Sequence, residues 1–166
     1  MSIEIERKFL IQKPTFQLSE LEFINIKQGY ICIESQTGNV VRIRKSNNDY
    51  FLTIKSKGDQ SRIEVENPIS KIDFDSLWGI VHNRSVTKKR YLLPYKNHLI
   101  EIDEYMGRLN GLWTAEIEFE STSDAETFET PNWLAKEVTV DKRFKNHSLA
   151  LLTNPNEVTS LYDLYF

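Results

Sequence analysis

The feature that most constrains this chain is a regular alternation of apolar and charged residues close to its start. Residues 3–11 place Glu4, Glu6 and Lys8 on one side of an extended backbone, and aliphatic or aromatic residues on the other side. A period of two is typical of a β-strand that has one buried and one polar face. Taken alone, this segment fits an ordinary solvent-exposed strand. A recurrence of this pattern along the chain would distinguish a functional charged face from an ordinary solvent-exposed one.

The same alternation does recur along most of the chain. We expect further strands at residues 24–34, 40–45, 50–57, 62–66, 85–93, 98–105 and 113–120, and a helix at 70–82. Seven of the strands carry charged residues, acidic and basic in a mixed set, at alternate positions on one face. These are Glu4, Glu6, Lys8, Arg42, Arg44, Lys55, Arg62, Glu64, Glu66, Lys88, Arg90, Glu101, Asp103, Glu116, Glu118 and Glu120.

Two arrangements satisfy this pattern. In one, helices cover the aliphatic side of an open sheet, and the charged side faces water with no function. In the other, an antiparallel barrel closes with its charges inside. Two details favour the barrel: closely spaced acids recur as Glu-x-Glu, which is unfavourable on a plain strand surface, and the arginine fork suits phosphate oxygens. A polyanion with divalent metal ions would fit such an interior, because carboxylates bind the metal while Lys and Arg neutralise phosphate.

Composition limits the alternatives further. With 166 residues the chain is long enough for one domain, residues 1–166, with a sizeable core. Its net charge of −3, from 21 basic and 24 acidic residues, argues against nucleic acid or an anionic membrane as a partner. Cys32 is the single cysteine, and no secretory leader or membrane-length apolar run is seen, so we expect a cytoplasmic protein.

The charged blocks also resemble a known family, the triphosphate tunnel metalloenzymes or CYTH domains, in its small bacterial branch. The resemblance is carried by Glu4-x-Glu6-x-Lys8, Arg42-Ile43-Arg44, Thr53-Ile54-Lys55, Arg62-Ile63-Glu64-Val65-Glu66, Lys88-Lys89-Arg90-Tyr91, Glu101-Ile102-Asp103, Ala115-Glu116-Ile117-Glu118 and Asp141-x-Arg143-Phe144. These blocks follow the family's order along nearly the whole chain. The resemblance implies an α+β fold in which a closed eight-stranded antiparallel barrel with covering helices forms a triphosphate tunnel.

The resemblance also implies roles for individual residues. Substrate phosphates would be bound by Lys8, Arg42, Arg44, Arg62, Lys88 and Arg90, with an interior ion pair as the alternative role for Arg62. Mg²⁺ or Mn²⁺ would be held by Asp103, Glu116 and Glu118, and a second metal or its waters by Glu4 and Glu6. Tyr30 and Lys55 match a dyad that activates water. The local sequence fits equally well a second interpretation, in which Tyr30 is a packed aromatic residue and Lys55 is a phosphate ligand.

The function that we expect is metal-dependent hydrolysis of triphosphate, most simply inorganic triphosphate, to diphosphate and phosphate. The alternatives are an adenylyl cyclase, a thiamine triphosphatase, or a non-catalytic module that binds polyphosphate or nucleotide. The cyclase branch carries a His-Phe segment upstream of Glu-x-Glu-x-Lys, and that segment is absent here. Met106 and Lys142 depart from the family pattern, both in turns. A small-molecule triphosphate is the expected partner, and a homodimer is left open.

Overall fold

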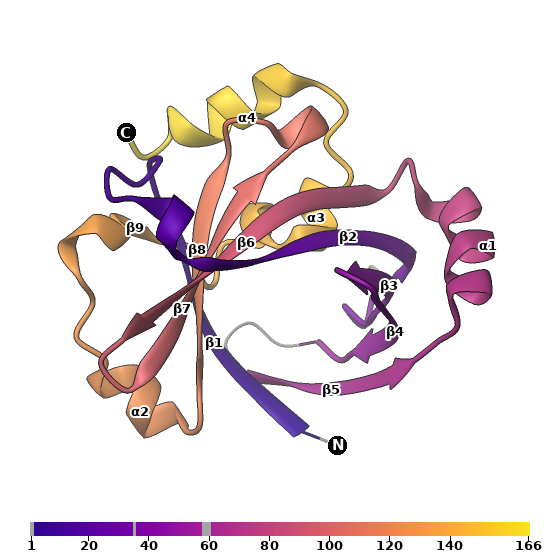
Figure 1. Ribbon diagram of the computed structural model, residues 1–166, viewed down its shortest axis with the longest axis horizontal. Helices are drawn as coiled ribbons and strands as arrows, with labels where there is room; N and C mark the ends of the chain where they lie inside the picture. Colours follow the sequence, from indigo (N-terminus) through magenta and orange to yellow (C-terminus); the bar gives the residue numbers. More distant parts are fainter. Residues whose placement is uncertain (1, 35, 58–60) are drawn as a thin grey trace.

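A ring of antiparallel strands dominates the protein (Figure 1). The computed structural model describes residues 2–34, 36–57 and 61–166, apart from the side chains of residues 2, 3, 61, 62 and 155. In ring order the strands are β1 (Ser2–Leu10), β5 (Ser61–Pro68), β4 (Asp49–Lys55), β3 (Val40–Ser46), β2 (Glu22–Ile33), β6 (Ser85–Tyr95), β7 (His98–Tyr105) and β8 (Trp113–Phe119). The prediction of eight antiparallel strands in an α+β fold is confirmed.

The ring joins through β1, which pairs along both of its edges. On one edge, residues 5–10 pair with β8. On the other edge, residues 2–5 pair with β5, and residues 9–10 pair with the short strand β9 (Lys136–Glu137). The seam between β1 and β5 comprises four residue pairs, so the expected closure is correct in strand order but limited to a short stretch.

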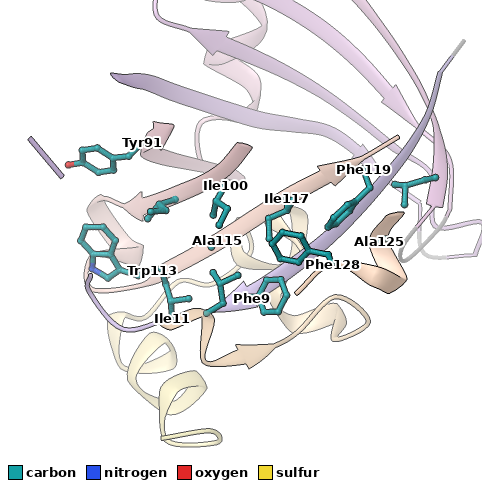
Figure 2. Packing of buried hydrophobic residues seen from close by; sticks show 13 residues of the cluster. Phe9, Ile11, Tyr91, Ile100, Trp113, Ala115, Ile117, Phe119, Ala125 and Phe128 are labelled. Carbon is teal, nitrogen blue, oxygen red and sulfur yellow. The ribbon is translucent and has the colours of Figure 1, made fainter. Parts of the chain in front are cut away.

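Strand alternation sorts the side chains between the inside and the outside of the barrel. On β8, Glu116 and Glu118 line the internal cavity, whereas Ile117 and Phe119 on the same strand belong to an apolar cluster outside the ring. Figure 2 shows this cluster, in which Phe128 packs beside the β8 residues. The short helix α2 (Thr122–Thr127) contacts β1 and β8 here. Burial of the outward apolar side chains therefore turns the charges inward.

The helix α1 (Lys71–Val81) lies outside the ring against β2, β3 and β4 (Figure 1). The Ser70 hydroxyl caps its start by accepting a hydrogen bond from the Asp73 backbone N–H at 3.0 Å. Gly29 on β2 is where helix and strand approach most closely. A Cβ atom added at Gly29 would lie 2.3 Å from Val81 Cγ2, so this glycine permits the contact.

The C-terminal segment packs against one end of the barrel. It contains the 3₁₀ turn η4 (Lys142–Phe144) and the helices α3 (Asn146–Leu149) and α4 (Pro155–Tyr162). Its buried residues join inward-facing apolar residues of the strands in one cluster that includes Leu10, Tyr30, Val40, Val86, Tyr105, Phe144, Leu149, Val158 and Leu161. The barrel interior is therefore apolar at this end and charged farther along.

The remaining elements are short connections. They are the 3₁₀ turns η1 (Leu18–Glu20), η2 (Gly107–Leu109) and η3 (Asn132–Leu134). Across the described residues, none of the helices combines the length and the apolar character needed to cross a bilayer.

Candidate active site

The charged inner faces of the strands surround a cavity of about 310 Å³. Its charged wall consists of Glu4, Glu6, Lys8, Arg42, Arg44, Lys55, Lys88, Arg90, Glu116 and Glu118. The wall thus brings together ten residues that the strand pattern and the family resemblance singled out. Most of its basic groups come from β3, β4 and β6, and its carboxylates come from the neighbouring strands β1 and β8, so the cavity can hold an anion and a cation side by side.

Lys8 and Glu116 form the most deeply buried ion pair of this wall. They face each other across β1 and β8, with 2.8 Å between Lys8 Nζ and Glu116 Oε1. Arg90 Nη2 reaches the other Glu116 oxygen at 2.5 Å. Burial opposes ionisation of Glu116, but Lys8, Lys88 and Arg90 outweigh it and hold the pKa of that carboxyl well below its usual value. Glu116 is therefore charged throughout the physiological range.

Asp103 lies behind the wall and does not line the cavity. Arg90 donates to it through Nε at 2.7 Å and through Nη2 at 2.8 Å, and the Lys88 ammonium contacts the same carboxylate. Asp103 is expected as a metal ligand, but here both of its oxygens are occupied by basic side chains. Its position suits a residue that orients the Arg90 guanidinium.

On the opposite side of the cavity, Lys55 lies between two carboxylates. Its Nζ is 2.8 Å from both oxygens of Glu4 and 2.7 Å from Glu64 Oε2. A place beside the arginines of the wall would favour a neutral Lys55 amine through like-charge repulsion. The contacts observed are carboxylates instead, and these stabilise the ammonium form.

Arg42 and Arg44 extend the basic wall along β3. Arg44 Nη2 is 2.6 Å from Glu66 Oε2, and Arg42 Nη2 is 3.6 Å from Glu64 Oε1. The Nε atoms of both arginines are buried and have no hydrogen-bond partner among the described residues. Such donors are available to an incoming oxyanion. The expected phosphate ligand Arg62 cannot be placed, because its side chain lies outside the described part of the structure.

Tyr30 reaches the cavity from β2, next to the apolar end of the barrel. Its hydroxyl accepts a hydrogen bond from Gln28 Nε2 at 2.8 Å. The ring meets the His147 ring edge-on, with 6.3 Å between the centroids. Tyr30 is opposite Arg42 on β3, and Lys55 on β4 is opposite Val40, so the expected dyad spans neighbouring positions of three adjacent strands.

The CYTH domain family model matches residues 2–149. The chain belongs to the CYTH family. The resemblance inferred from the charged blocks is thereby confirmed, and it accounts for the charged interior of the ring.

Individual CYTH relatives are similar over most of their length. An inorganic triphosphatase from Nitrosomonas europaea is 41% identical over 150 residues, covering 89% of this chain and 97% of its own. An inorganic triphosphatase from Acetivibrio thermocellus is 31% identical over 151 residues, covering 90% and 94%. The crystal structure of the inorganic triphosphatase NE1496 aligns with a TM-score of 0.69 at 37% identity, covering 93% of this chain and 98% of that chain.

A divalent cation goes with CYTH membership, and the oxygen donors of the wall suit a hard cation. Glu118 supports this fit, because partial burial, followed by repulsion from Glu101, Glu4, Glu116 and Glu6, raises its pKa to about 7. A nearby cation would relieve that repulsion. In the described part of the chain, however, no three His, Cys, Asp or Glu side chains converge as a ready-made metal site. The carboxylates of the wall are chemically suitable metal ligands. In this structure, however, Glu4 pairs with Lys55, and Glu116 pairs with Lys8 and Arg90.

The cavity also has residues that the sequence argument missed. Besides Gln28, the C-terminal segment of this CYTH chain contributes Lys142, Lys145, Asn146 and His147. They lie in or just after a polar turn that carries no strand alternation, so no periodic signal connects them with the barrel interior. The Asp141-x-Arg143-Phe144 block pointed to this region, but Asp141 and Arg143 pair with each other at 2.5 Å instead of entering the cavity.

Proposed function

We propose that this protein hydrolyses inorganic triphosphate to diphosphate and phosphate inside the barrel. The observation that carries the proposal is the wall that presents six basic side chains and four carboxylates to one cavity of about 310 Å³. A compact polyanion that binds together with a cation matches such a wall. The names of the two curated relatives agree with this substrate.

In this proposal the basic wall exchanges partners when substrate enters. Lys8 and Arg90 turn from Glu116, and Arg44 turns from Glu66, toward phosphate oxygens, which they bind together with Arg42 and Lys88 at close range in a water-poor site. Asp103 keeps the Arg90 guanidinium oriented during this exchange, and so acts as a positioning residue.

Carboxylates released by that exchange would bind the metal. Glu6, Glu116 and Glu118, with Glu4 beside them, are the residues that we assign to it. When bound there, Mg²⁺ or Mn²⁺ would neutralise phosphate oxygens and make the terminal phosphorus more open to attack. Glu118 completes this group because the repulsion that raises its pKa disappears next to a cation.

We propose that Lys55 accepts the proton of the attacking water and that Tyr30 orients the groups for this transfer. The Tyr30 hydroxyl accepts from Gln28, and a phenol hydroxyl can also donate, which suits a residue that orients a water toward the Lys55 nitrogen. Once a bound cation draws Glu4 away, the Lys55 ammonium loses one of the carboxylates that stabilise it. A lysine in that setting can lose its proton and then accept one from the attacking water, a contribution typically of about 10²–10⁴-fold in rate.

The deciding experiment compares phosphate release from triphosphate, ATP, thiamine triphosphate and diphosphate, with Mg²⁺ and with Mn²⁺. We expect triphosphate to be hydrolysed fastest, and EDTA to stop the reaction. Lys71→Met, which removes an exposed lysine on α1, serves as the charge-matched control for substitutions in the wall. Faster formation of cyclic AMP from ATP would replace this proposal with a cyclase, and binding without any phosphate release would indicate a non-catalytic module.

Three properties of the whole protein remain part of the proposal. We infer a single domain spanning residues 1–166, because every helix packs on the one ring of strands. We also infer a reducing, cytoplasmic environment, since Cys32 is free and exposed. A measurement of the protein's mass in solution would test whether it forms a homodimer.

A further inference from the structure

The internal cavity continues past the charged wall to a second group of basic residues near the protein surface. Lys57 follows β4, and Lys142 and Lys145 belong to the C-terminal segment, yet all three line the same cavity. Lys57 and Lys142 are exposed, so the cavity reaches solvent between them. We call these three residues the lysine mouth.

The lysine mouth differs from the wall in how its charge is balanced. In the wall, carboxylates lie within 2.5–2.8 Å of Lys8, Lys55, Arg44 and Arg90. At the mouth, none of the described carboxylates lies within ion-pair distance of the Lys57 or Lys142 ammonium. Glu34 is the acidic residue that lines this part of the cavity, and it accepts hydrogen bonds from Thr37 and Asn39. Among the described residues that line the opening, positive charge is therefore in excess.

Lys145 is a buried residue of the cavity lining, so the lysine mouth is not made of exposed surface lysines alone. Its side chain is 8% exposed, although a buried ammonium is costly unless anionic or polar groups solvate it. Asn146 and His147 lie beside it on the cavity lining and offer hydrogen-bond donors that suit phosphate oxygens. Gln36, an exposed residue of the cavity lining beside Glu34, is also polar.

We propose that the lysine mouth is an additional phosphate subsite, which binds the part of a linear inorganic polyphosphate that extends beyond three phosphates. This inference rests on the proposed function, since that function commits the wall to the first three phosphates. A fourth phosphate that leaves the wall on this side meets Lys57, Lys142 and Lys145. Tetraphosphate should therefore bind more tightly than triphosphate, whereas a nucleoside in the same position should gain nothing.

The test follows the disappearance of triphosphate by ion chromatography, with tetraphosphate as competitor. In Lys57→Met/Lys142→Met we expect the inhibition constant of tetraphosphate to rise about tenfold, with the KM for triphosphate changed less than about twofold. Lys71→Met/Lys136→Met removes the same charge from positions that do not line the cavity and should change neither constant. Lys145→Met should act in the same direction, and Lys145→Arg should restore binding. Both members of the first pair are exposed, so that variant should fold.

The outcomes separate the two proposals. If the wild-type protein does not hydrolyse triphosphate, the proposed function is wrong, and the subsite is withdrawn with it. If triphosphate is hydrolysed but the double variant leaves tetraphosphate inhibition unchanged, the subsite alone is wrong. A proportional rise of both constants would also overturn the subsite, because it would show general electrostatic attraction at the opening.

Discussion

Lys8 and Glu116 lie directly opposite each other on β1 and β8, where their side chains form an ion pair of 2.8 Å with little access to solvent. The pair connects the first strand of the chain with the last strand of the eight-stranded ring. Because Arg90 reaches the second oxygen of Glu116, the carboxylate is shared between two cations. The same carboxylate is one that we assign to metal binding, so structure and function compete for it.

Lys8→Met tests the structural side of this relationship. It leaves Glu116 buried with Arg90 alone, and we expect the free energy of unfolding to fall by about 2–4 kcal/mol. Lys8→Met/Glu116→Gln should lose less than the sum of the two single changes, since the unpaired charge is removed. Urea denaturation of the three variants measures both quantities, and strict additivity would show that the ion pair does not couple the strands.

Glu118→Gln should stabilise the metal-free protein while abolishing turnover. A carboxyl group with a pKa of about 7 when folded and about 4.5 when unfolded binds more protons in the folded state between those values. The free energy of unfolding therefore falls as pH rises through this window. At pH 8 we expect the variant to gain roughly 1 kcal/mol, less than the full shift implies, because Glu118 is partly open to solvent.

This gain should shrink toward zero below pH 4.5, where Glu118 is protonated in both states. Urea denaturation at pH 4.5 and at pH 8 in EDTA provides the measurement. Glu126→Gln, an exposed position on α2, is the control and should show no such pH dependence. A variant that is less stable than wild type at pH 8 would mean that repulsion at Glu118 is already relieved.

Gly29→Ala should destabilise the fold by about 1–3 kcal/mol, because the new methyl group would overlap Val81 on α1. Adding Val81→Ala should recover part of the loss by removing the overlapping methyl groups. Gly79→Ala makes a sensitive control: nothing lies within 4 Å of a Cβ there, and alanine in place of a helical glycine should stabilise by about 0.5–1 kcal/mol. Thermal unfolding of the three variants distinguishes overlap from a general intolerance of glycine replacement.

Tyr30→Phe and Lys55→Met should each lower kcat for triphosphate by about 10²-fold or more, and change KM much less. Their combination should be little worse than the more severe single change, as expected for two residues that act as a unit. Steady-state kinetics with Lys71→Met as the unaffected control provides the comparison. Weaker binding with unchanged kcat would show that Lys55 is a phosphate ligand only.

The inner face of the barrel was predictable because a period of two fixes which residues share a side of a strand. Glu116 and Glu118 are inside for this reason, and so is Lys8. Cross-strand neighbours were not predictable in the same way, since they depend on how far each strand is shifted along the next. That shift brings Lys55 to Glu4 instead of to the arginines, and it leaves Asp103 behind Arg90.

The C-terminal contribution escaped prediction for a different reason. Lys145 and His147 follow a 3₁₀ turn and enter the cavity from outside the strands, so their position depends on how Phe144 and Leu149 pack against the barrel end. Packing of that kind is decided by tertiary contacts and leaves no short-range pattern in the sequence.

The short seam between β1 and β5, together with the pairing of β1 to β8, has a consequence for how the protein is made. Strand β1 leaves the ribosome well before its β8 partners, which lie at residues 114–119. Until they emerge, the apolar residues of β1 have no cover and its charged residues have no enclosed space to line. Contacts between such distant segments form slowly. The nascent chain should therefore depend on chaperones that hold β1 until β8 has been synthesised.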